Sequence, residues 1–147
     1  MTTGHNIASA LRAAYLALHR RSDAAFAPHG VTADQFVLLA TLAREGHALT
    51  QRELSRRMSS DPSTVRAMLV LLERRGLVER EAHPTDARTP SAVRAYRRLW
   101  AAGEPIRGQM LGELGPGEAE SFVELLGRVA AALAAGEVST HSPGTES

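Results

Sequence analysis

Two short helical patterns follow each other closely in residues 50–76, and this feature constrains the fold most. The first begins with Thr50-Gln51-Arg52-Glu53, a capping box in which the threonine and the glutamate satisfy each other's free amides, and it predicts a helix over residues 51–58. The second begins at Asp61, a favoured N-cap residue, and Pro62 suits its first turn because no amide is needed there. Only a tight turn separates the two helices.

The second helix has an apolar stripe that indicates which side faces the core. The stripe consists of Val65, Met68, Leu69 and Leu72, at the i, i+3, i+4, i+7 spacing. Gly76 ends the helix in a left-handed turn, and residues 77–81 alternate as a strand does. With a short extended piece at Ala48-Leu49, the order strand, helix, turn, helix, strand is that of a winged helix-turn-helix, whose second helix enters the major groove of DNA.

The outward side of this second helix has the chemistry of base contacts. Its residues are Ser63, Thr64, Arg66, Ala67 and Val70. Hydroxyl groups reach base edges or phosphates, an arginine can bind guanine in a bidentate manner, and an alanine can touch a thymine methyl group. The free amides at the helix start also suit a phosphate. The alternative is that the hydroxyl residues only stabilise the helix start and that Arg66 is a solvated charge.

Helical periodicity extends to both sides of this unit. A first helix is expected from Asn6 to about Ala27, followed by a helix that Thr32 and Gln35 open with a second capping box. After Thr89-Pro90, a long helix to about Leu114 is expected, with a kink at Pro105. A strand over the residues AVRAY is the alternative for the start of that segment. A last helix follows with apolar residues in register, namely Phe122, Leu125, Leu126, Val129 and Leu133.

Charge is distributed unevenly along the chain, although the net charge is only +1. Residues 51–98 hold 11 arginines and 6 acidic residues, whereas the rest of the chain holds 6 arginines and 10 acidic residues. An arginine-rich middle between acidic ends is typical of a chain that presents one face to phosphate.

Several classes of function are excluded or disfavoured. The chain has no cysteine, which excludes disulfides, thiolate zinc sites and cysteine nucleophiles. The six histidines show no ligand spacing, and no nucleophile elbow, phosphate-binding glycine loop or carboxylate pair appears, so neither a metal, a cofactor nor an enzyme is expected. The N-terminus does not read as a signal peptide and no apolar run approaches membrane-spanning length, so a cytoplasmic location is expected.

The central 58 residues, from Val31 to Arg88, resemble the MarR family of bacterial transcription regulators. The matching segments are VTADQFVLLATLAREG, LTQRELSRRMSSDPSTVRAMLVLLERRGLVER and HPTDAR. The resemblance implies a mostly α, homodimeric winged helix-turn-helix protein that binds pseudo-palindromic DNA, most simply as a repressor. It also implies release of the DNA by a small, often aromatic and anionic, ligand.

The resemblance also implies an organisation and a set of site residues. One domain is expected over residues 6–135, with a DNA-binding lobe at 32–88, dimerisation helices at 6–28 and 89–135, and flexible termini at 1–5 and 136–147. DNA contacts are expected from Gln51, Arg52, Ser60, Pro62, Ser63, Thr64, Arg66, Ala67 and Arg88, with Asp86 orienting Arg88. The residues expected near a ligand are Tyr15, His19, His29 and Trp100. Packing in the core or at an interface is the alternative role of the aromatic ones.

The wing departs from the family pattern. A second strand usually returns before the next helix, but here Arg88 is followed directly by Thr89-Pro90, which already resembles a helix start. Either the wing is short, or a wing loop is missing from the sequence. A short wing invites a second hypothesis, in which the protein is a winged-helix module that binds another protein and no longer binds DNA.

Overall fold

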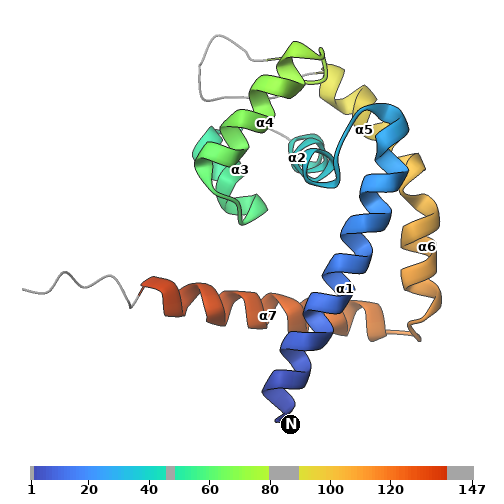
Figure 1. The fold of residues 1–147 in the computed structure, drawn as a ribbon, viewed down its shortest axis with the longest axis vertical. Coiled ribbons are helices and arrows are strands. Elements are labelled where there is room, and N and C mark those ends of the chain that lie inside the picture. The colour runs from blue at the N-terminus through green and yellow to red at the C-terminus, as the bar shows by residue number, and fades with distance from the viewer. Residues whose placement is uncertain (1, 46–48, 80–89, 139–147) are drawn as a thin grey trace, which may run out of the picture. The chain divides into compact units, whose positions relative to one another are not determined.

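The computed structural model describes residues 2–45, 49–79 and 90–138 (Figure 1). These residues form seven α-helices and one short 3-10 helix, η1. The elements are α1 (Thr3–Phe26), η1 (Ala27–His29), α2 (Ala33–Arg44), α3 (Gln51–Met58), α4 (Pro62–Arg74), α5 (Pro90–Ala102), α6 (Glu104–Gly112) and α7 (Glu118–Val138). None of the helices in the described part of the chain is long and apolar enough to cross a membrane.

The chain divides into two compact units, residues 1–106 and residues 107–147. In the first unit, α2 lies at the centre and contacts α1, α3, α4 and α5 (Figure 1). Its core is apolar, and the largest side chains with less than 2% exposure are Leu38, Leu39, Leu42, Leu49, Leu54, Leu69, Leu72, Val65 and Val78. The helix-turn-helix elements are therefore anchored on α2, which leaves their other sides for contacts.

Both expected capping boxes are present. The Thr32 hydroxyl accepts from the Gln35 amide at 3.1 Å, and the Gln35 side chain accepts from the Thr32 amide at 3.1 Å. The Thr50 hydroxyl accepts from the Glu53 amide at 3.2 Å, and the Glu53 carboxylate accepts from the Thr50 amide at 3.0 Å. These reciprocal bonds fix where α2 and α3 begin.

The turn between α3 and α4 is tight. Ser59 ends α3 in the left-handed region, with φ 51°, and its amide donates back to Arg56. At the other end of α4, Gly76 has φ 70°, and the Leu77 amide donates to the Leu72 carbonyl at 2.9 Å. The expected left-handed turn at Gly76 is confirmed.

The segment that begins at Pro90 is helical, so the alternative of a strand over AVRAY is wrong. The expected single helix to about Leu114 is also wrong, because α5 ends at Ala102 and α6 begins at Glu104. The break lies at Gly103, two residues before the expected kink at Pro105. A proline disrupts the helix on its N-terminal side and is tolerated in a first turn, and Pro105 is the second residue of α6.

Residues 3–5 and 136–138, which lie in the termini expected to be flexible, belong to α1 and α7. The expected strands of the wing differ from the structure. Residues 77–79 have no regular secondary structure, and Thr50 forms an isolated β-bridge. Strands are stabilised by pairing with a neighbour, and residues 77–79 have no such neighbour in the described ranges. The remaining residues of the expected wing, 80–89, lie outside those ranges.

Candidate nucleic-acid interface

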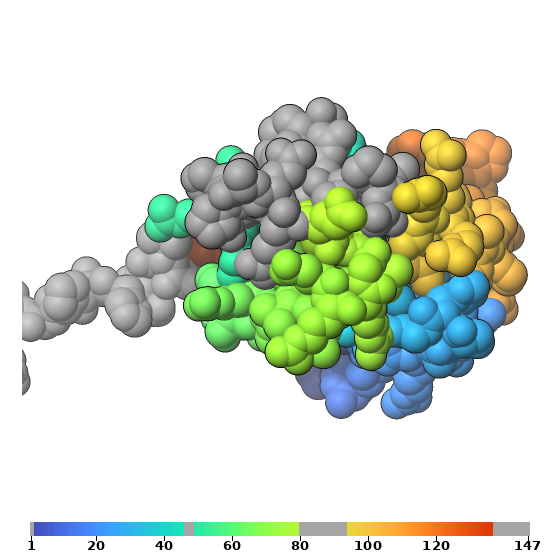
Figure 2. Space-filling model, turned by 90° about the horizontal axis from the view of Figure 1, so that it is seen from above, coloured from blue at the N-terminus to red at the C-terminus, as the bar shows by residue number. Residues whose placement is uncertain are grey.

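The exposed side of α4 consists of the residues expected to meet DNA. Ser63, Thr64, Arg66 and Ala67 are all exposed. Behind them, the stripe of Val65, Met68, Leu69 and Leu72 is buried, with exposed fractions of 0%, 9%, 1% and 0%. The helix is therefore held by one side while the other faces solvent. Figure 2 shows the surface of α4 in light green.

The start of α4 is capped by Asp61. One carboxylate oxygen accepts from the amide of Ser63 at 3.1 Å and from that of Thr64 at 3.4 Å, and it also accepts from the Ser63 hydroxyl. The hydrogen bond from the Ser63 side chain, followed by those from the two amides, lowers the pKa of Asp61 below its ordinary value of 3.8. The expectation that these amides are free for a phosphate is therefore wrong, because a carboxylate already occupies them.

The remaining expected contacts lie close to the turn. Arg52 is exposed on the first turn of α3, whereas Gln51 is half-buried and its carbonyl accepts from the Ser55 hydroxyl at 2.9 Å. The Ser60 hydroxyl donates to the Met58 carbonyl at 3.2 Å. Pro62 is the first residue of α4. The two wing residues of the expected site, Asp86 and Arg88, lie outside the described residues.

Arginines give this surface its positive charge. Arg57 forms an ion pair with Glu45, which ties α3 to the end of α2. Arg52, Arg56 and Arg66 are exposed and form no ion pair within the described part of the chain. Sequence reasoning missed Arg56, although it lies four residues after Arg52 and so on the same side of α3. The helix-turn-helix surface thus carries cations that a phosphate backbone can engage.

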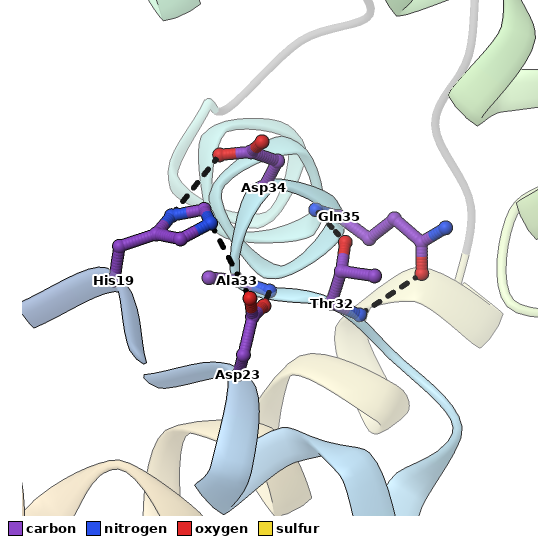
Figure 3. A network of polar contacts seen from close by, with 6 residues as sticks. All are labelled: His19, Asp23, Thr32, Ala33, Asp34 and Gln35. Carbon is purple, nitrogen blue, oxygen red and sulfur yellow. Dashed lines mark hydrogen bonds and ion pairs between the residues drawn. The ribbon is translucent and has the colours of Figure 1, made fainter. Parts of the chain in front are cut away.

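His19, one of the residues expected near a ligand, lies in a polar network between α1 and α2 (Figure 3). Its ring nitrogens lie 3.3 Å from a carboxylate oxygen of Asp23 and 4.0 Å from one of Asp34. The other oxygen of Asp23 accepts from the Ala33 amide at 2.7 Å, so α1 helps to cap α2. The Tyr15 ring lies 5.5 Å from that of His19.

Trp100 ends a row of aromatic rings that crosses the first unit. Successive ring centroids from Phe26 to Phe36, Tyr96 and Trp100 are 4.4, 6.0 and 5.6 Å apart. His29 lines a separate small cavity beside α5. Tyr15, His19 and Trp100 do not line that cavity. Within the described residues, no group of three possible ligands for a metal occurs.

No curated protein matches the chain in sequence. Among solved structures, the transcriptional regulator MosR of Mycobacterium tuberculosis is 26% identical, with a TM-score of 0.70 over 85% of this chain and 95% of that one. The M. tuberculosis MarR family protein Rv2887 in complex with DNA is 25% identical, with a TM-score of 0.66 over 88% and 98%. Rv2887 was also solved with p-aminosalicylic acid.

A more distant structure has a closer shape. A MarR family transcriptional regulator from Rhodococcus sp. RHA1 is 19% identical but has a TM-score of 0.77 over 88% of this chain and 96% of that one. The helix-turn-helix on α2, together with these structures, defines a mostly α-helical winged-helix protein. The sequence model of the MarR family matches residues 29–89, and the chain carries a MarR-family domain there.

Proposed function

We propose that this protein is a transcription regulator that binds double-stranded DNA with α3 and α4. The observation that carries this proposal is the exposed side of α4 with Ser63, Thr64 and Arg66, supported from behind by a fully apolar stripe. Side chains of this kind at the start of a second helix are those that read base edges in the major groove. Exposed Arg52 and Arg56 on α3 would contact the phosphate backbone.

The acting form that we propose is a homodimer on a pseudo-palindromic site. In the second unit, α7 leaves large apolar side chains exposed, namely Phe122, Val123, Leu125, Val129 and Leu133, with exposed fractions of 47%, 70%, 53%, 37% and 68%. On α1, Ile7 and Tyr15 are 48% and 57% exposed. Apolar surface of this extent is typical of an interface. Two copies related by a two-fold axis would place their two α4 helices one DNA turn, roughly 34 Å, apart.

Regulation by a small ligand completes the proposal. Trp100 is 44% exposed and belongs to the aromatic row, and an aromatic ligand can stack on its exposed part. A ligand there would stabilise dimers with one distance between the two α4 helices over dimers with another, which is a population shift. Repression relieved by such a ligand is the mode that we propose, as a relative binds p-aminosalicylic acid.

A gel-shift experiment tests the proposal. The full-length protein is incubated with duplex DNA from upstream of its own gene, and with a shuffled duplex of the same composition as the control. We expect the protein to retain the upstream duplex at concentrations at least tenfold lower than those that retain the shuffled duplex. Equal retention of both would reject sequence-specific regulation. Retention of neither would favour the alternative, a winged-helix module that binds another protein.

A further inference from the structure

Two serine hydroxyl groups around the start of α4 donate their hydrogens within the protein. The Ser60 hydroxyl donates to the Met58 carbonyl at 3.2 Å, and the Ser63 hydroxyl donates to the Asp61 carboxylate. A hydroxyl group has one hydrogen and two lone pairs, so each serine is left with acceptor capacity only. The bond from Ser63 is charge-assisted and is therefore of the stronger kind. Neither serine has a hydrogen left to give to DNA.

The backbone at the start of α4 has no free hydrogen either. Pro62 has no amide hydrogen, and the amides of Ser63 and Thr64 donate to the Asp61 side chain. The amide of Val65 donates to the Asp61 carbonyl at 3.1 Å. The phosphates of DNA accept hydrogen bonds and do not donate them. The first four residues of α4 therefore have no amide available for a phosphate.

One oxygen of the Asp61 carboxylate is left for an outside partner. The three hydrogen bonds that the side chain accepts all end on Oδ2. Oδ1 accepts none from a described residue, and the side chain is exposed. The bond from the Ser63 hydroxyl, followed by those from the two amides, lowers the pKa of Asp61, so Oδ1 belongs to an ionised group at neutral pH. An ionised carboxylate only accepts hydrogen bonds.

Few groups of DNA can donate to an acceptor in this position. In the major groove the donors are the N4 amino group of cytosine and the N6 amino group of adenine. Adenine has the N7 acceptor beside its amino group, and a carboxylate near N7 would be repelled. Cytosine has no acceptor of its own in the major groove, and carboxylate side chains accept from its amino group. Cytosine is therefore the better match.

We propose that Asp61 contacts a cytosine in the major groove, with Oδ1 accepting a hydrogen bond from the N4 amino group. This assignment rests on the proposed function, in which the start of α4 enters the groove. It adds a base preference of the opposite sense to that of Arg66, whose guanidinium group donates and so matches the acceptors of guanine. The negative charge of Asp61 also disfavours phosphates at the start of the helix.

The position of Arg66 indicates where the cytosine should lie. Arg66 is five residues after Asp61, which corresponds to about 7.5 Å along the helix axis at 1.5 Å per residue. Successive base pairs of DNA are about 3.4 Å apart. The cytosine and the guanine that Arg66 contacts should therefore lie within about three base pairs of each other.

The experiment compares the base preferences of the wild type and Asp61→Asn. Duplexes that the full-length protein binds are selected from a pool with a randomised centre. Each base pair of the selected site is then changed in turn, and the affinity is measured by fluorescence anisotropy. In Asp61→Asn the amide oxygen still caps α4, and the amide nitrogen replaces Oδ1, so that an acceptor becomes a donor.

The expected difference concerns one C·G pair. Changing it to T·A places the O4 acceptor of thymine where the amino group was, and should weaken binding to the wild type at least about tenfold. In Asp61→Asn this loss should fall to about threefold or less, whereas the losses at other positions should stay as they are. Loss of a negative charge near DNA strengthens binding to all duplexes alike, so ratios between duplexes are compared.

Two further variants control the comparison. Asp34→Asn removes the same charge from an exposed aspartate in the first turn of α2, and should keep the wild-type loss at every position. Asp61→Ser keeps a capping hydroxyl group but removes the second oxygen, and should lose the cytosine preference as Asp61→Asn does. Circular dichroism checks that each variant is folded.

Three outcomes would overturn the assignment. If Asp61→Asn and Asp61→Ser keep the wild-type losses at every position, or lose affinity equally for all duplexes, Asp61 does not contact a base, although the proposed function stands. The same holds if the cytosine lies more than about half a DNA turn from the base pair that Arg66→Ala affects. If the wild type binds no duplex, the proposed function is rejected and the assignment with it.

Discussion

The carboxylate of Asp61 makes the stability of the start of α4 depend on pH. Its carboxylate accepts from two amides and one hydroxyl at the start of α4, and its pKa is lowered by these bonds. A carboxyl group with a lowered folded-state pKa stabilises the fold above its unfolded pKa, and this contribution is lost as the pH falls through the folded value. The start of α4 should therefore become less stable in acid.

Replacing Asp61 by Asn tests this sensitivity. The amide oxygen still caps the helix but does not titrate. The wild type should be more stable than Asp61→Asn at neutral pH, and the difference should shrink as the pH falls below 3.8, the ordinary value of an aspartate. Thermal unfolding followed by circular dichroism measures it. A difference that stays constant from pH 7 to pH 2.5 would show that the carboxylate is not the cause.

Arg66 and Arg52 should affect DNA binding in different ways. Arg66 lies on the exposed side of α4, so Arg66→Ala should cost about 1–3 kcal/mol at particular base pairs and relax the sequence preference there. Arg52 lies on α3, so Arg52→Ala should weaken binding to all duplexes alike. Fluorescence anisotropy with a set of single-substitution duplexes separates the two. If the two variants lose affinity equally for every duplex, the residues that contact the bases lie elsewhere.

At the scale of elements, α4 depends on its buried stripe. Leu69 is 1% exposed, and Leu69→Ala should lower the free energy of unfolding by about 2–5 kcal/mol because it leaves a cavity. Val70 is the next residue and is 37% exposed, so Val70→Ala serves as the control and should cost about 0.5 kcal/mol or less. Urea denaturation measures both. Similar losses for the two variants would mean that α4 is not packed as described.

Local signals predicted the helix-turn-helix unit well. The two capping boxes, the Asp61 cap and the apolar stripe of α4 depend on residues within one or two turns of each other, and all are confirmed. The break at Gly103 is not evident in the sequence, because the helical periodicity continues through it and the only local signal is the proline two residues later.

Contacts between residues that are far apart in the sequence could not be predicted from the sequence alone. The bond from the Ala33 amide to Asp23 joins two helices, and the aromatic row joins Phe26 to Trp100 through two other elements. Each requires the tertiary packing to be known. For the same reason, the sequence does not show that Tyr15 lies beside His19 or that Trp100 lies beside Tyr96.

At the scale of the whole molecule, the exposed apolar side of α7 leads to a prediction about assembly. Leu125 is 53% exposed, so a charged residue there should leave the protomer folded but destabilise a dimer that buries this side chain. Analytical ultracentrifugation should show a dimer for the wild type and a shift toward monomer for Leu125→Glu. Glu120→Gln, also exposed on α7, is the control and should remain dimeric. A monomeric wild type at micromolar concentration would reject the dimer.

If the arginines of α3 and α4 bind the phosphate backbone of DNA, the affinity for DNA depends on the salt concentration. The affinity for the upstream duplex is measured by anisotropy between 50 and 200 mM salt. Released counterions should make the affinity fall steeply, by roughly a thousandfold for a protein that makes about six phosphate contacts. Arg52→Ala should reduce the slope by about one. An affinity that does not change with salt, or a slope that Arg52→Ala leaves unaltered, would mean that these arginines do not bind the phosphates.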